Sequence, residues 1–252
     1  MVHLLPLPGS PGWGGSMNAV IERAVQDAVL LGEAGLDGLL VENYGDIPFY
    51  PTQAPPETLA ALAVCTREVT RAVGLPIGVN LLRNDAVGAL AAAAAAGARF
   101  IRVNVHTGVM VTDQGMLTGA AHETLRARAR LGEPIAILAD VWVKHADPLP
   151  GSDLARAAED TWRRGLADGL IVTGTGTGRA ADLTRLDTLR EALPEAPLWI
   201  GSGVTPESLA GVVRRANGVI VGSALEYEGK AGRGVDPDRA AALVAAARAV
   251  VQ

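Results

Sequence analysis

Short apolar runs alternate with longer helix-like segments eight times along this 252-residue chain, and this alternation constrains the fold more than any other feature. The apolar runs are rich in Val, Ile and Leu and are mostly bounded by Gly or Pro, which is typical of buried parallel strands. They are Met1–Leu5, Gly38–Asn43, Pro76–Leu81, Phe100–Val105, Pro134–Val141, Gly169–Thr173, Pro197–Gly201 and Gly218–Val221. The helix-like segments between and after them are Met17–Ala34, Pro56–Val73, Asp85–Ala96, Ala120–Leu131, Asp153–Arg164, Ala180–Leu193, Pro206–Arg215 and Asp236–Val251.

Eight strand–helix units of roughly 30 residues each predict an α/β fold, a (β/α)8 TIM barrel with parallel strands. A doubly wound open sheet also alternates, but it seldom needs eight regular units. No linker or shift in composition divides the chain, so we expect a single domain over residues 1–252. The first strand is expected to be short, because Pro6 follows Met1–Leu5 directly. Either the barrel closes on that short strand, or residues precede Met1 in a longer form of the chain.

The composition excludes several classes of protein. Hydrophobic residues make up 49% of the chain, which is enough for one large core and argues against disorder. The net charge of −5 argues against a nucleic-acid-binding role, which would need a clustered basic surface. No apolar run is long enough to cross a membrane, and the N-terminal segment does not resemble a signal peptide, so we expect a cytoplasmic protein. The single Cys65 excludes an intramolecular disulfide and a Cys-rich metal site.

Polar residues at the carboxyl ends of the predicted strands are the candidate catalytic residues, because a barrel carries its active site at that end. They are Glu42, Asn80, Arg102, Asn104, His106, Asp140 and Lys144. Alternation along the fourth strand places Arg102, Asn104 and His106 on one face and apolar residues on the other. The apolar face is expected to pack under the helices, so Arg102 and Asn104 should point into the barrel. The alternative is an internal layer of ion pairs, formed by Arg102, Glu42 and Asp140, that has no chemical role.

Glycine-rich turns after the last three strands are candidate phosphate-binding residues. Thr173 and Gly174 follow the sixth strand within a Thr-Gly repeat that runs to Gly178, and the later turns contribute Gly201, Ser202, Gly203, Gly222 and Ser223. Glycine lets the backbone approach a ligand closely, and its N–H groups can converge on an anion. The loops after strands seven and eight form the usual phosphate site of such barrels. A single Gly-Ser-Gly turn can equally be a tight turn without a ligand.

Lys144 follows the fifth strand and could act as a Schiff-base nucleophile, a phosphate-binding cation or a general acid, or could simply pair with Asp140. The long segment Thr107–Gly119 is interpreted as a mobile flap over the mouth of the barrel, where the carboxyl ends of the strands would surround a pocket. Tyr44–Pro56 is interpreted as a wall of that pocket. Magnesium is one cofactor to consider, since Glu42, Asp46, Asp140 and His106 offer suitable ligand atoms, but their spacing is not diagnostic. No Gly-x-Gly-x-x-Gly motif is followed by an acidic strand end, so a nicotinamide cofactor is not indicated.

Several long motifs make the chain similar to the BtpA/SgcQ family. They include Met-Val-His at residues 1–3, Val-Glu-Asn-Tyr-Gly-Asp at 41–46, Leu-Leu-Arg-Asn-Asp at 81–85, Ile-Arg-Val-Asn-Val-His at 101–106 and Asp-Val-Trp-Val-Lys-His at 140–145. The resemblance implies a relation to the ribulose-phosphate-binding barrels. One cyanobacterial member is named for a role in building photosystem I, and another branch is associated with sugar-phosphate or nucleosidase chemistry. The resemblance carries over no established catalytic residue.

These observations lead to two hypotheses of different kinds. In the first, the protein is an enzyme that acts on a small phosphorylated sugar or nucleoside-like metabolite by lyase, isomerase or hydrolase chemistry. In the second, it is a non-catalytic assembly or stability factor for a membrane complex such as photosystem I. A ligand-binding regulator without turnover is a third option. Barrels of this kind often form homo-oligomers, but no residue in the sequence shows whether this protein does.

Overall fold

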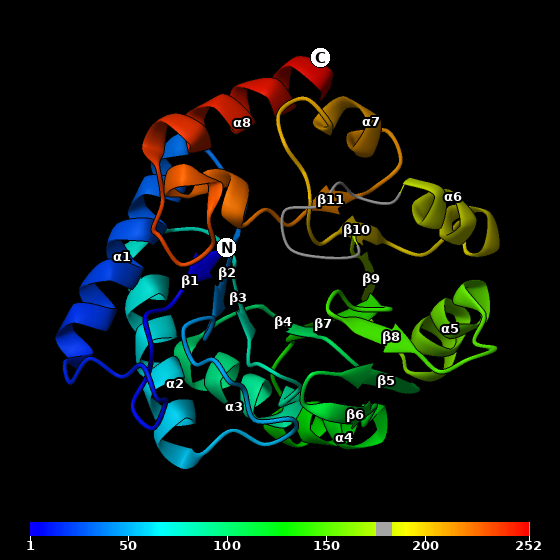
Figure 1. Ribbon diagram of the computed structural model, residues 1–252, viewed down its shortest axis with the longest axis horizontal. Helices are drawn as coiled ribbons and strands as arrows, with labels where there is room; N and C mark the ends of the chain where they lie inside the picture. The colour runs from blue at the N-terminus through cyan, green and yellow to red at the C-terminus, as the bar shows by residue number, and fades with distance from the viewer. Residues whose placement is uncertain (175–182, 252) are drawn as a thin grey trace.

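The computed structural model describes residues 1–174 and 183–251 and contains the predicted parallel sheet of eight strands. The strands stand side by side in the order β1, β2, β3, β4, β7, β9, β10 and β11, and the helices surround them (Figure 1). Their bounds are Val2–His3, Leu39–Glu42, Ile77–Asn80, Phe100–Val103, Ala136–Val141, Gly169–Val172, Leu198–Ile200 and Gly218–Val219. The curled sheet confirms the α/β class and the (β/α)8 barrel predicted from the alternation.

The short first strand is also confirmed, since β1 contains only Val2 and His3. Within the described residues, β1 and β11 share no ladder of backbone hydrogen bonds. The amino group of Met1 instead donates a hydrogen bond of 2.8 Å to the carbonyl oxygen of Val221. This contact brings the first and last strands together and completes the ring.

Most helices follow the predicted segments closely. Ser16 caps α1 (Met17–Ala34) by accepting the backbone N–H of Ala19, and Asp85 caps α3 (Ala86–Ala96) by accepting that of Gly88. The other helices are α2 (Pro56–Ala72), α4 (Ala121–Leu131), α5 (Leu154–Glu159) with the π-helical turn η1 (Asp160–Arg164), α6 (Leu183–Ala192), α7 (Leu209–Val213) and α8 (Pro237–Val251). The seventh helix is thus shorter than the predicted Pro206–Arg215. The first residues of the predicted sixth helix, 180–182, lie outside the described residues.

The amino-terminal half of the barrel interior is filled by large side chains that lie against glycines. The ring of Phe100 on β4 covers Gly78 on β3, where an added Cβ atom would lie 2.2 Å from the ring. Trp199 on β10 covers Gly218 on β11 in the same way, at 2.4 Å. These rings pack with a cluster of Met1, Leu40, Leu138, Ile171 and Ile220. The barrel is therefore closed at this level, and polar residues can gather only above it.

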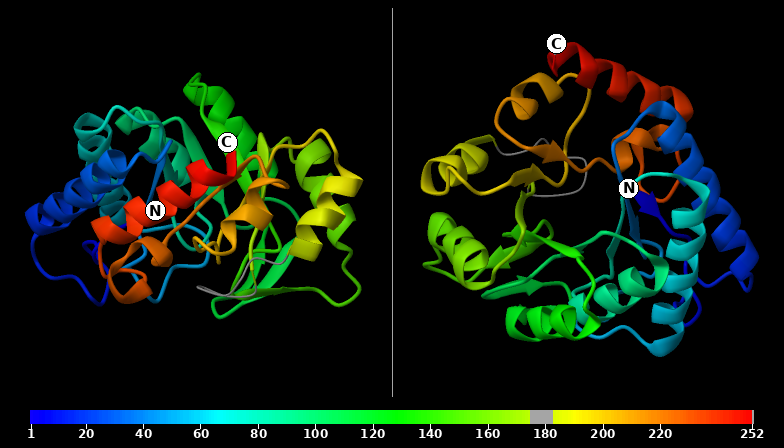
Figure 2. Two further views of the ribbon diagram at one scale, coloured as in Figure 1. Left: turned by 90° about the horizontal axis from the view of Figure 1, so that it is seen from above. Right: turned by 180° about the vertical axis from the view of Figure 1, so that it is seen from behind.

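The segment Thr107–Gly119, which was interpreted from the sequence as a mobile flap, contains a β-hairpin. Strands β5 (Val109–Thr112) and β6 (Gly115–Thr118) pair with each other, and β5 also pairs with β8 (Ala146–Pro148). Figure 2 shows this small antiparallel sheet beside the barrel strands. Met110 and Leu117 pack on Val105 and Val143 in a separate apolar cluster, which anchors the hairpin. None of the helices in the described ranges has the length and apolar character needed to span a membrane.

Candidate functional site

Six polar side chains form a layer at the carboxyl end of the barrel interior, directly above the apolar cluster. The register pairs His3 with Glu42 across β1 and β2, and Glu42 with Asn80 across β2 and β3. The remaining three residues of the layer are Arg102, Asn104 and Asp140. All six are buried, and their inward direction agrees with the strand alternation expected for β3, β4 and β7. The fold therefore concentrates unusually many polar groups at one end of its core.

Arg102 and Asp140 form a two-pronged ion pair in this layer. Arg102 donates from Nε and Nη2 to the two carboxylate oxygens of Asp140 at 3.1 and 3.0 Å. Asn104 donates to the same carboxylate at 2.7 Å, and its own Oδ1 is buried without a partner among the described residues. Burial alone would lower the pKa of Arg102, but the charge of Asp140 raises it above its usual value. Asp140 is therefore held by its neighbours and is poorly placed to accept a proton from a ligand.

Glu42 has a different environment, because its nearest partners are the amide of Asn80 and the imidazole of His3. Asn80 donates to Glu42 Oε2 at 2.5 Å, and His3 Nε2 lies 3.6 Å from Oε1. Burial tends to raise the pKa of Glu42, but the positive charges of His3 and Lys144 bring it below the usual value. Glu42 is thus an ionised carboxylate at neutral pH, and it makes no ion pair with Arg102 among the residues described.

Glu226 is a buried site residue that the sequence analysis missed. Its Oε1 atom is hydrogen-bonded to His3 Nδ1, and its second oxygen accepts the backbone N–H of Gly234. The ring of Tyr44 lies 4.6 Å from that of His3. His3 is therefore placed between two carboxylates. Glu226 lies in the loop after β11, the eighth strand of the barrel. Its position in that loop is the one signal in the sequence that could have indicated a site residue.

Lys144 reaches the mouth from the loop after β7. It makes no hydrogen bond or ion pair through its ammonium group in the part of the chain that the structure describes. Burial lowers its pKa, and the charge of Arg102 lowers it further. The residues around it, Trp142 and His145, have positive φ angles of 55° and 57°, which non-glycine residues adopt rarely and which cluster at functional sites. Lys144 is thus a poorly compensated cation on a constrained loop.

The glycine turns after β10 and β11 meet these groups in one cavity of about 30 Å³. Its lining combines the charged residues Glu42, Arg102 and Lys144 with the predicted turn residues Gly201, Ser202, Gly203, Gly222 and Ser223. Ser202 accepts the backbone N–H of Gly174 at 3.1 Å, and Thr173 donates to the carbonyl oxygen of Trp142 at 3.3 Å. Thr173 and Gly174 therefore support the turns from behind. The rest of the predicted Thr-Gly repeat, residues 175–178, lies outside the described residues.

Two residues of the predicted site lie elsewhere. The Nε2 atom of His106 is 2.8 Å from the carbonyl oxygen of Gly165, on the outer side of the sheet. Asp46 accepts the backbone N–H of Leu7 and the side-chain amide of Asn43. Within the described ranges, no group of three metal-ligating side chains comes together. The four residues considered for magnesium are thus dispersed, because Glu42 and Asp140 belong to the polar layer, whereas His106 bonds Gly165 and Asp46 bonds Leu7 and Asn43.

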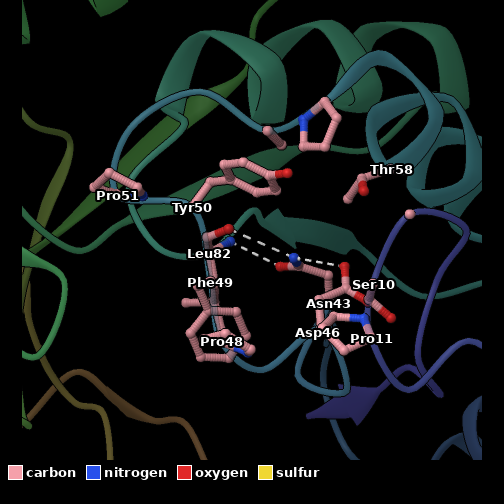
Figure 3. Close-up of a pocket in the computed structure, with 13 residues that line it drawn as sticks. Ser10, Pro11, Asn43, Asp46, Pro48, Phe49, Tyr50, Pro51, Thr58 and Leu82 are labelled. Carbon is pink, nitrogen blue, oxygen red and sulfur yellow. Dashed lines mark hydrogen bonds between the residues drawn. The ribbon is translucent and has the colours of Figure 1, made fainter.

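The segment Tyr44–Pro56 lines a second cavity instead of the mouth, apart from Tyr44 itself. This cavity of about 320 Å³ lies between the loop of Ser10 and the amino end of α2, with Phe49, Tyr50 and four prolines in its wall (Figure 3). It shares no lining residue with the mouth cavity. Asn43, which lines this cavity, forms hydrogen bonds with the backbone of Leu82 in the loop after β3. The expectation that this segment forms a wall of the same pocket is therefore corrected.

The fold and the polar layer define a (β/α)8 barrel whose mouth combines acidic, basic and glycine-rich elements. The model of the BtpA family matches residues 1–249, and the chain belongs to this family. The photosystem I biogenesis protein BtpA of a Synechocystis strain is 47% identical over 246 residues, which cover 98% of this chain and 86% of that protein. An uncharacterised protein of Thermococcus kodakarensis is 45% identical over 100% of this chain and 95% of its own length.

Solved structures with a similar fold include two enzymes. Phosphoribosyl anthranilate isomerase from Thermus thermophilus has a TM-score of 0.60 at 16% identity, covering 90% of this chain and 94% of that one. Thiamine phosphate pyrophosphorylase from Pyrococcus furiosus has a TM-score of 0.58 at 15% identity, covering 90% and 91%. At such identities the likeness establishes the barrel fold alone.

Proposed function

We propose that this protein is an enzyme that acts on a small phosphorylated sugar or nucleoside-like metabolite at the carboxyl end of the barrel. The observation that carries the proposal is the shared lining of one cavity. Glu42 and Lys144 face the same space as the glycine turns after β10 and β11. An ionised carboxylate and an amine of lowered pKa beside an anion-binding turn are what acid–base chemistry on a phosphate ester requires.

The residues of the mouth would divide the work. The backbone N–H groups at Ser202–Gly203 and Gly222–Ser223 would bind the phosphate, helped by the serine hydroxyl groups, whereas the N–H of Gly201 already donates to the carbonyl oxygen of Val172. Glu42 would accept a proton from the substrate, and Lys144 would donate one or stabilise developing negative charge. Arg102 would act as a positioning residue, since Asp140 holds its guanidinium in place. Because the cavity measures only about 30 Å³, the remainder of the substrate would extend outward and displace the loops at the rim.

Two similar structures carry names that agree with this proposal. The printed names of both enzymes, a phosphoribosyl anthranilate isomerase and a thiamine phosphate pyrophosphorylase, refer to phosphorylated compounds. The argument for this chain nevertheless depends on its own turns and charged residues, because the same barrel supports many unrelated activities.

A thermal-shift screen tests the proposal directly. Sugar phosphates, nucleotides and their unphosphorylated counterparts are compared with and without Mg²⁺. A ligand at about 100 times its Kd stabilises the folded state by roughly 2.7 kcal/mol, which such an assay detects. We expect shifts from phosphorylated compounds only, reduced in Ser202→Ala and unchanged in the matched control Ser152→Ala, whose side chain is exposed. Hits are then assayed for turnover in the wild type and in Glu42→Gln. An absence of shifts across the panel would refute the phosphate site.

A non-catalytic role in assembling a membrane complex is the second hypothesis. The observation in its favour is the name of the Synechocystis relative, photosystem I biogenesis protein BtpA. The two hypotheses differ in what the mouth must do. Lys144→Ala and Glu42→Gln should abolish the function of an enzyme in cells, whereas an assembly factor that binds through its outer surface should tolerate both. Full complementation by both variants would favour the assembly role.

A further inference from the structure

Arg83 is a buried cation that the predicted site did not include. It lies in the loop between β3 and α3 and is only 5% exposed. Its Nη2 atom donates to the carbonyl oxygen of Lys144 at 2.8 Å, while its Nε atom is buried without a partner among the residues described. It makes no ion pair within the described ranges. A buried charge without a counter-ion is costly, and native proteins normally pair it or use it to bind a ligand.

The loop that carries Arg83 is held firmly on both sides. The backbone N–H of Arg83 donates to the carbonyl oxygen of Tyr50 at 3.0 Å. The side chain of the next residue, Asn84, bonds both the N–H and the carbonyl group of Val105 at 2.8 and 2.9 Å. Asp85 then caps α3. The guanidinium group is therefore presented by a fixed backbone, as expected for a residue that recognises a ligand.

Arg83 lies beside a second cation, because it contacts the carbonyl oxygen of Lys144, which lines the mouth. Burial lowers the pKa of Arg83, and the charges of Asp140 and Asp113 act against this effect. The pKa of Lys144 is lowered by burial first and, in smaller part, by the charge of Arg83. The two cations thus repel each other, and the carboxylate of Asp140 is already engaged by Arg102. An anion between Arg83 and Lys144 would relieve both effects.

Arg83 and the glycine turn after β10 follow strands on opposite sides of the barrel. β3, which leads to Arg83, is the third strand of the eight in the sheet, and β10, which leads to Gly201–Gly203, is the seventh. In a closed ring of eight, the third and seventh positions face each other. Lys144 follows β7, the fifth strand in the order, and so lies between them. A ligand bound to the glycine turns would point its far end towards Arg83.

We infer that the ligand of the mouth carries two anionic groups, a phosphate at the glycine turns and a second carboxylate or phosphate that binds Arg83 and Lys144. This inference depends on the proposed function and narrows its substrate class to phosphorylated acids or bisphosphates. Arg83 is well suited to the task, because its planar group can bind two oxygens of one carboxylate or phosphate.

Matched pairs of compounds test the inference, since the members of each pair differ only in the second anion. The pairs are 3-phosphoglycerate with glycerol 3-phosphate, 6-phosphogluconate with sorbitol 6-phosphate, and ribulose 1,5-bisphosphate with ribulose 5-phosphate. The first two pairs probe a carboxylate at two reaches, and the third probes a phosphate. Affinities are measured by calorimetry at low salt. In at least one pair, we expect the member that carries the second anionic group to bind about tenfold more tightly or better. This is the size of effect that hydrogen bonds to a charged group give.

Variants assign the preference to Arg83. Arg83→Gln should reduce the preference to less than about twofold, whereas Arg83→Lys should retain part of it. The control Arg71→Gln removes the same charge from an arginine that is 67% exposed at the far end of α2, and should keep the full preference. If Arg83→Gln does not fold, the wild-type pairs and Arg83→Lys still decide the question.

The outcomes separate this inference from the function on which it depends. If monophosphates bind and the second anion adds nothing in any pair, the inference fails and the phosphate site stands. If the preference exists but survives Arg83→Gln, the assignment to Arg83 is wrong. If no member of any pair binds, both the phosphate site and this inference are refuted.

Discussion

Asp140→Asn should destabilise the protein strongly, because it removes the counter-ion of a buried guanidinium. The wild-type carboxylate accepts three hydrogen bonds, two from Arg102 and one from Asn104, and both side chains of the ion pair are almost inaccessible. Breaking a buried pair from one side costs about 3–5 kcal/mol. Since the charge of Glu42 also acts on Arg102, the lower end applies, and we expect a loss of about 3 kcal/mol.

Urea unfolding followed by circular dichroism and tryptophan fluorescence measures this effect. A loss of about 3 kcal/mol corresponds to a decrease in Tm of roughly 6–12 °C for a domain of this size. The double variant Arg102→Met, Asp140→Leu removes both charges and leaves only Asn104 short of a partner, so it should remain within about 2 kcal/mol of the wild type. The reasoning is refuted if Asp140→Asn costs less than about 1 kcal/mol, or if the double variant is as unstable as the sum of the single variants.

Three further predictions concern His106, Gly78 and Lys144. Burial holds the pKa of His106 below its usual value, so the unfolded state takes up a proton first and the free energy of unfolding should fall as the pH drops below about 6.5. Urea midpoints at pH 7 and pH 5 should show a smaller difference in His106→Gln, and equal differences would contradict the assignment. Gly78→Ala would force a Cβ atom against the ring of Phe100 and should cost about 1–3 kcal/mol in the same unfolding assay, whereas an unchanged midpoint would contradict the packing. Lys144→Met replaces a half-buried cation that makes no ion pair among the described residues, and should raise the free energy of unfolding at pH 7 by about 1 kcal/mol while weakening phosphate-ester binding; lower stability with intact binding would argue against a ligand role.

The sequence predicts those parts of the fold that depend on local periodicity and capping. Alternation placed Arg102 and Asn104 inside the barrel, and the helix-like segment Met17–Ala34 coincides with α1. The hairpin at Val109–Thr118 was missed, because its strands are short and their partner β8 comes from another loop. Pairing between distant segments leaves little trace in either segment alone.

The candidate site was predicted less completely than the fold, for two physical reasons. Alternation gives the direction of a side chain only while the strand continues, and β4 ends at Val103, so it did not apply to His106. Loop residues carry no such periodicity, so the burial of Arg83 and Glu226 became visible only when tertiary contacts were known. The roles of Asp140 and Glu42 differ for the same reason. One carboxylate meets an arginine and the other meets an amide and an imidazole, and no local pattern distinguishes these surroundings.

The central claim is that the glycine turns after β10 and β11 bind a phosphate in the same cavity as Glu42 and Lys144. A crystal structure of the protein with a phosphorylated compound from the thermal-shift screen tests it most directly. We expect phosphate oxygens within hydrogen-bonding distance of the backbone N–H groups at Ser202–Gly203 or Gly222–Ser223, with the rest of the compound directed towards Lys144. A phosphate bound in the cavity beside Asp46 and Tyr50, or on the outer surface of the helices, would contradict it.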